Sequence, residues 1–172
     1  IAYILKARTT ILRDMGAAMS PFNAFMFIQG LETLALRIRE HSKNADEIAN
    51  FLMNHPKVDR VSHPSVASDL AKERADKYLS GGCGGLMGFE IKGGVEAGKQ
   101  FINSLEMFYH VANIGDSRSL AIHPASTTHS QLNEEELLSA GVTPGYVRLS
   151  IGLEHLDDIK DDLSQALDKV SV

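Results

Sequence analysis

The chain has 172 residues, of which 44% are apolar and 23% charged, a balance typical of a soluble globular protein with one domain and a piece of another. Its net charge of −5 argues against a nucleic-acid-binding protein, and no apolar run is long enough to cross a membrane. The single cysteine, Cys83, cannot form an internal disulfide, and no signal-peptide pattern opens the chain, so we expect a cytoplasmic setting.

The N-terminal third of the chain is predicted to be helical. Apolar residues recur at helical spacing over residues 1–14, and no capping residue precedes them, so we expect a fragment whose upstream sequence is missing. Ser20-Pro21 then marks a helix start, because serine caps a free N–H and proline fits the first helical position. The apolar stripe that follows predicts one long linking helix, which ends before Pro56.

Shorter elements follow in chain order. The strands predicted from short or alternating apolar runs are 57–62, 86–92, 109–114, 118–122 and 146–151. The helices predicted from apolar spacing and capping signals are 67–79, 133–139 and 155–170, together with one after Gly93-Gly94 that carries Ala97, Phe101, Ile102 and Leu105. Strands that alternate or cluster among helices predict an α/β or α+β fold, in which helices cover a small sheet.

The strand at 146–151 is the most informative element for function. Val147, Leu149 and Ile151 alternate as its buried face, which puts Arg148 on the opposite face. A guanidinium on a rigid strand suits a carboxylate, which it can hold through two parallel hydrogen bonds. The alternative is an ordinary surface ion pair, and periodicity by itself favours that alternative.

The sequence does not decide the role of two polar segments. The loop at 123–130 is rich in hydroxyls and imidazoles, which are typical of a ligand site on a loop, but also of turns in which Ser and Thr bind the local backbone. The glycine run at 81–85 precedes a strand, unlike a dinucleotide fingerprint, so we expect it to form a tight turn around an inert Cys83. No metal site is expected, because the histidines are scattered and Cys83 has no partner cysteine.

Six stretches resemble, in the same order, motifs of the Cys/Met-metabolism group of pyridoxal-phosphate enzymes. They are LRDMG at 12–16, SPFNAF at 20–25, QGLETL at 29–34, ANIGD at 112–116, HPASTTHS at 123–130 and VRLSIGLE at 147–154. Together they cover nearly the whole chain. The second and third are most similar to the O-acetylhomoserine sulfhydrylase branch of this family.

This resemblance implies a fold and a division of the chain. The fold is the C-terminal domain of a fold-type I pyridoxal-phosphate-dependent transferase, with a small, largely antiparallel sheet preceded by the long linking helix. Residues 1–19 are then the tail of an upstream cofactor-binding domain, and residues 20–172 form the substrate-recognition domain. The family holds pyridoxal 5'-phosphate on a lysine of an upstream motif that this sequence lacks. We therefore expect no catalytic, cofactor-binding or metal-ligating residue in this chain.

The resemblance also implies substrate-binding residues and an activity. Arg148 aligns with the family arginine that grips the α-carboxylate of the amino-acid substrate, and Asn113 aligns with a position that lines the same pocket. The complete enzyme would be a homotetramer that converts O-acetylhomoserine and sulfide (or a thiol) to homocysteine (or methionine) and acetate, and the fragment would be inactive alone. The alternatives are a fragment of a related cystathionine γ-synthase or methionine γ-lyase, and a non-catalytic small-molecule-binding domain.

Overall fold

The computed structural model describes residues 1–171, without the side chains of residues 69 and 134. The chain divides into two compact units, Ile1–Ala35 and Leu36–Val172. The predicted assignment of residues 1–19 to an upstream cofactor-binding domain stays a prediction. None of the helices in the described part of the chain is long and apolar enough to span a membrane.

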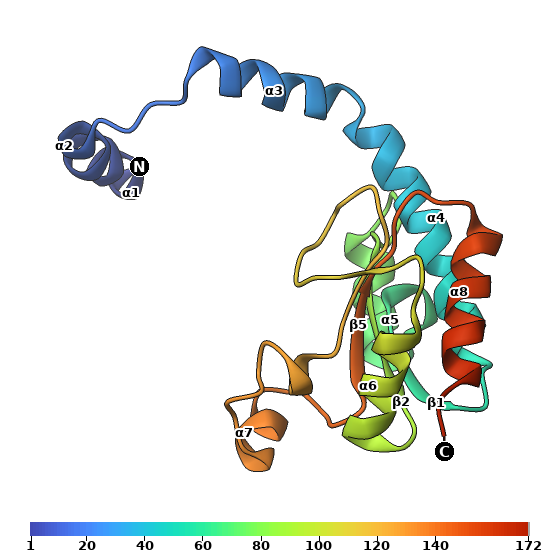
Figure 1. The fold of residues 1–172 in the computed structure, drawn as a ribbon. Coiled ribbons are helices and arrows are strands. Elements are labelled where there is room, and N and C mark those ends of the chain that lie inside the picture. The colour runs from blue at the N-terminus through green and yellow to red at the C-terminus, as the bar shows by residue number, and fades with distance from the viewer. Residues whose placement is uncertain (172) are drawn as a thin grey trace. The chain divides into compact units, whose positions relative to one another are not determined.

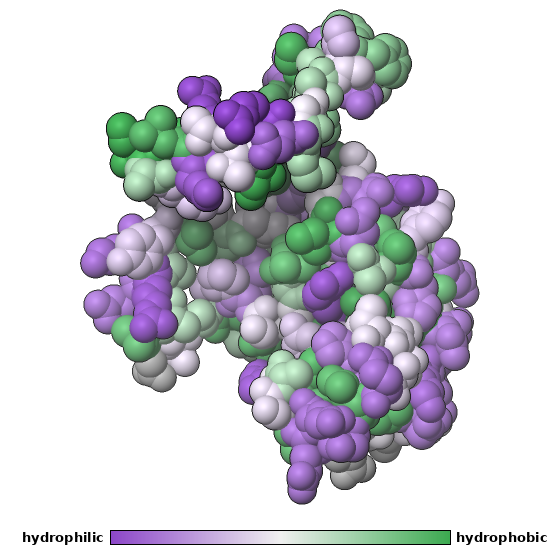
Figure 2. Space-filling model, turned by 90° about the vertical axis from the view of Figure 1, so that its left-hand side faces the viewer, coloured by the Kyte–Doolittle hydropathy of each residue, from purple (hydrophilic) through white to green (hydrophobic). Residues whose placement is uncertain are grey.

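The first unit is helical, as its apolar spacing predicts. Helix α1 (Ala2–Lys6) continues through a π-helical stretch (Ala7–Leu12) into α2 (Arg13–Met15), and α3 (Pro21–Glu32) follows. The predicted cap of α3 is confirmed, because the Asn23 N–H donates to the Ser20 hydroxyl over 3.1 Å. Apolar side chains along this unit are exposed, and Figure 2 shows such side chains in green at the surface beside the hydrophilic ones.

The single long helix predicted from Ser20 is wrong in one respect. Thr33 adopts φ −103° and ψ 1°, which separates α3 from α4 (Leu34–Met53). Threonine disfavours helix because its branched Cβ restricts the side chain against the preceding turn. The C-terminal half of the predicted apolar stripe is core, since Ala45, Ile48 and Leu52 of α4 are fully buried.

The sheet has five strands in the order β1-β2-β5-β4-β3. They are β1 (Val58–Ser62), β2 (Leu86–Ile91), β3 (Tyr109–His110), β4 (Leu120–Ile122) and β5 (Tyr146–Ser150). Only the pair of β3 and β4 is parallel, and the other three pairs are antiparallel. The prediction of a small, largely antiparallel sheet is therefore confirmed.

The predicted strands at 109–114 and 118–122 are shorter in the structure. The chain leaves the sheet after His110 and returns at Leu120. Between them Gly115 adopts a left-handed φ of 77°, and the Asp116 carboxylate accepts a hydrogen bond from the Arg118 N–H at 3.0 Å. In such a turn the aspartate side chain binds a backbone N–H group, which in a strand would form a hydrogen bond with the neighbouring strand.

Helices α4, α6 (Gly94–Ser104) and α8 (Leu156–Asp168) pack with the sheet in one hydrophobic core (Figure 1). The buried face predicted for β5 is confirmed, because Val147, Leu149 and Ile151 are fully buried. The remaining helices are α5 (Asp69–Tyr78) and α7 (Glu134–Ser139), with short 3₁₀ turns at Pro64–Val66 and Pro124–Ser126. The core thus covers one face of the sheet, and the opposite face of β5 carries Arg148.

Candidate functional site

Arg148 projects from the middle of β5 on the face that the core does not cover. Its Nη2 donates a hydrogen bond to the backbone oxygen of Asn113 over 3.3 Å. Among the described residues no Asp or Glu forms a salt bridge with it, so the interpretation of Arg148 as an ordinary surface ion pair has no support here. A guanidinium has five N–H donors, and most of those of Arg148 are left for a ligand.

The structure brings the two predicted substrate-binding residues together. Asn113 meets Arg148 through its backbone, while its side-chain oxygen accepts from the Ile114 N–H at 2.9 Å. The contact therefore joins the Asn113 loop to the guanidinium without using the amide side chain. The predicted role of that side chain in a carboxylate pocket stays a prediction.

A hydrogen-bond network fixes the loop that carries Asn113. The Gly115 N–H donates to the Ser150 hydroxyl on β5 over 3.1 Å. Further on, the N–H and hydroxyl of Ser119 both donate to the Glu154 carboxylate, at 2.7 and 2.9 Å. The sequence pattern did not predict a role for Ser119. Only its partner Glu154 lies in one of the family motifs, at the end of the VRLSIGLE stretch.

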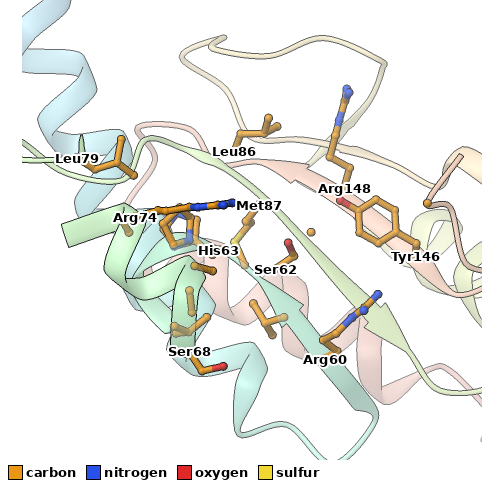
Figure 3. A pocket seen from close by; sticks show the side chains of 18 of the residues that line it. Arg60, Ser62, His63, Ser68, Arg74, Leu79, Leu86, Met87, Tyr146 and Arg148 are labelled. Atoms are coloured by element: carbon orange, nitrogen blue, oxygen red, sulfur yellow. The ribbon is translucent and has the colours of Figure 1, made fainter. Parts of the chain in front are cut away.

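A cleft of about 980 Å³ opens beside Arg148, between α5 and the strands β1, β2 and β5 (Figure 3). Three arginines line it, namely Arg60, Arg74 and Arg148, and no Asp, Glu or Lys does so among the described side chains. The cleft is large enough for a small metabolite. Its lining favours an anionic one.

His63 lies buried in this cleft, and its burial disfavours the positively charged imidazolium. Loss of water on burial lowers the pKa of His63, against the opposing effects of the Gly84 carbonyl and the nearby Asp46. Its Nδ1 lies 2.7 Å from the Ser65 hydroxyl and 3.7 Å from Asp46 Oδ1. The permanent positive charges of the cleft are those of its arginines.

The polar loop at 123–130 is held together by its own side chains. His123 is fully buried, and its ring nitrogens lie 2.8 Å from the Ser126 hydroxyl and 2.8 Å from the Pro144 carbonyl oxygen. Thr127 donates its hydroxyl to the His123 carbonyl oxygen over 2.8 Å. Burial lowers the pKa of His123. These contacts support the turn interpretation of the loop over the ligand-site interpretation.

The fold and the cleft define an α/β domain with an arginine-lined cleft. The sequence profile of the family described as Cys/Met metabolism PLP-dependent enzyme matches residues 3–168. The chain belongs to this family, as its six motifs predict.

The relatives give the same result. The chain is 57% identical to an O-acetyl-L-homoserine sulfhydrylase of Leptospira meyeri, over 99% of this chain and 39% of the relative. It is 48% identical to O-acetyl-L-homoserine sulfhydrylase 1 of Thermus thermophilus, over 97% and 40%. The chain thus spans about two fifths of the length of these relatives.

A solved structure confirms the fold. It is that of a Campylobacter jejuni protein assigned as an O-acetylhomoserine (thiol)-lyase, which carries N'-pyridoxyl-lysine-5'-monophosphate. The match has a TM-score of 0.87 at 47% identity, and covers 97% of this chain and 40% of that protein. The predicted fold class, a domain of a pyridoxal-phosphate enzyme, is confirmed.

Pyridoxal phosphate is the cofactor of the family. Among the described residues no lysine lines the arginine cleft, so the cleft does not fit the covalent attachment of this cofactor. Lys57 donates hydrogen bonds from its Nζ to three carbonyl oxygens at the end of α8, at 2.8 to 3.1 Å. The acceptors are the carbonyl oxygens of Leu167, Asp168 and Val170. That lysine caps a helix, because cations stabilise the carbonyl end of a helix.

Pyridoxal phosphate added to the purified chain is therefore expected to give no specific lysine adduct. After borohydride reduction, peptide mapping should find no lysine modified at one equivalent per chain, and the absorbance band of a bound aldimine should be absent. A full-length relative treated in the same way serves as the positive control. Stoichiometric modification of one lysine would contradict this expectation and place a cofactor site in this chain.

Proposed function

We propose that this chain forms the carboxylate-recognition part of a pyridoxal-phosphate-dependent sulfhydrylase. The complete enzyme converts O-acetylhomoserine and sulfide (or a thiol) to homocysteine (or methionine) and acetate. The observation that carries the proposal is Arg148, a guanidinium on a rigid strand that has one carbonyl partner and no carboxylate partner among the described residues. The names of the similar proteins support the choice of substrate.

Arg148 acts by binding and orientation. Two parallel N–H donors of a guanidinium match the two oxygens of an α-carboxylate, and the bond to the Asn113 carbonyl holds the guanidinium toward the loop. The cofactor, when bound, supplies an electron sink for deprotonation of the substrate. A fixed carboxylate gives the substrate one orientation, which lowers the entropic cost of reaching the reactive geometry.

Exposed apolar surface supports contacts beyond this chain. Phe22, Phe25 and Leu31 of α3 are each more than half exposed, at 71%, 56% and 62%. Large apolar side chains that are exposed along one helix are typical of an interaction site. We propose that it packs against the remaining three fifths of the enzyme and against other subunits of a tetramer, in the cytoplasm.

The substrate is tested with the complete enzyme that contains this chain. O-Acetylhomoserine with sulfide should be turned over with a kcat/KM at least about 100-fold above that for L-methionine or cystathionine, a ratio within reach of substrate discrimination. Homocysteine and acetate should form in equal amounts. Preferred elimination from L-methionine would indicate a γ-lyase, and preferred synthesis or cleavage of cystathionine would indicate a cystathionine enzyme. Turnover of none of these substrates would indicate a non-catalytic binding domain.

A further inference from the structure

A second group of donors lies in the cleft, apart from the Asn113 loop. Arg60 and Ser62 come from β1, Arg74 from α5 and Tyr146 from β5, and all four line the cleft. Figure 3 shows Arg74 reaching into the cleft from α5, while Arg148 extends away from both Arg60 and Arg74. None of these four side chains has a hydrogen bond or an ion pair with another described residue.

Gly88 allows these donors to approach one another. In the sheet it pairs with Ser62 on β1 and with Arg148 on β5. A Cβ added at Gly88 would clash with the hydroxyl and the ring of Tyr146, so the ring lies across the bare backbone of β2. The Tyr146 hydroxyl thereby reaches from β5 toward Ser62 on β1.

The span between the outer strands suits a small ligand. Neighbouring strands lie about 4.8 Å apart, so about 10 Å separates β1 from β5 across β2. In Figure 3, Ser62 lies between Arg74 and Tyr146, and Arg60 approaches from the other end of β1. The cleft around Ser62 is therefore bordered by hydroxyl and guanidinium donors.

The charge of the cleft selects an anion. Two guanidiniums without a carboxylate partner face a lining that has no Asp or Glu among the described side chains, in a protein whose net charge is −5. Guanidiniums bind carboxylate and phosphate oxygens through strong charge-assisted hydrogen bonds. Two cations with two hydroxyl donors match the charge and the several oxygens of a phosphate dianion better than those of a single carboxylate.

We propose that the cleft above Gly88 binds a phosphate group, either inorganic phosphate or that of a phosphate monoester, through Arg60, Arg74, Ser62 and Tyr146. This site is separate from the carboxylate site proposed at Arg148. It needs neither the substrate nor the activity assigned above.

Isothermal titration calorimetry of the purified chain with inorganic phosphate at low ionic strength tests the proposal. The double variant Arg60→Gln/Arg74→Gln should weaken binding at least about tenfold, and Tyr146→Phe should weaken it about threefold, in line with the loss of charged and neutral hydrogen bonds. Lys72→Gln is the matched control, because it removes one charge from the same helix as Arg74, outside the cleft. It should change the affinity less than about twofold, since exposed charges are screened. Circular dichroism should be the same for all variants.

Titration with glycerol 3-phosphate, a phosphate monoester that has no carboxylate to bind at Arg148, distinguishes the two sources of phosphate. Equal or weaker affinity for glycerol 3-phosphate indicates inorganic phosphate, tighter binding indicates a monoester, and either result supports the site. The proposal is overturned if neither ligand binds, or if Lys72→Gln weakens binding as much as the double variant. It is also overturned if Arg148→Gln abolishes binding while Arg60→Gln/Arg74→Gln leaves it intact, because the anion would then lie at Arg148.

Discussion

Replacing Arg148 with alanine in the complete enzyme is expected to raise the apparent KM for O-acetylhomoserine about 100-fold. Hydrogen bonds to charged groups contribute about 1.5–3 kcal/mol each, and a loss of about 3 kcal/mol corresponds to about 100-fold in affinity. The turnover number should fall as well, because a substrate whose carboxylate is not fixed reaches the reactive orientation less often. Steady-state kinetics with varied O-acetylhomoserine at saturating sulfide measures both effects.

Two further variants define what the guanidinium contributes. Arg148→Lys keeps the charge but loses the planar pair of donors, so its KM should lie between those of the wild type and Arg148→Ala. Arg39→Ala removes an exposed guanidinium outside the cleft and should leave the KM within about twofold, as surface substitutions do. An unchanged KM in Arg148→Ala, with the fold intact, would refute the assignment of Arg148 to the substrate carboxylate.

Replacing Asp162 with alanine is expected to lower the free energy of unfolding by about 3 kcal/mol. Asp162 on α8 is 7% exposed, and its carboxylate accepts three backbone N–H donors, from Glu106 (2.9 Å), Met107 (2.9 Å) and Phe108 (3.2 Å). Alanine leaves these N–H groups without their acceptor at the end of α6. An unpaired buried polar group costs about 1–3 kcal/mol, and more where a charged partner is lost.

Urea unfolding followed by circular dichroism measures this loss. Asp161→Ala is the matched control, because Asp161 is the preceding residue of the same helix and is exposed. Its substitution should change the unfolding free energy by less than about 0.5 kcal/mol. Equal and small effects of the two substitutions would mean that the three N–H groups find water or other acceptors when Asp162 is removed.

Asp162 also matters for the proposed carboxylate site. It ties α8 to the segment 106–108, which leads directly into β3 and then into the loop that carries Asn113. Ser150 and Glu154 hold the far side of the same loop. The position of the Asn113 carbonyl beside Arg148 therefore depends on side chains outside the cleft.

The local elements of this protein follow from its sequence. Alternation over Tyr146–Ser150 predicts both the strand and the side on which Arg148 lies, because successive side chains of a strand point to opposite faces. Apolar spacing and capping residues predict α5 to α8, and the Asn133/Glu136 capping box forms as its residues indicate. The family motifs predict the fold class that the similar structure confirms.

The functional surface depends on contacts between residues far apart in the chain. Periodicity cannot show that Arg60, Arg74 and Arg148 line one cleft, or that Asp162 meets the backbone of Met107. The break at Thr33 and the early end of β3 at His110 were likewise not readable from apolar spacing, which reports a local preference. Strand order and loop closure decide these features, because they determine which backbone and side-chain groups are paired and which remain free to bind a ligand.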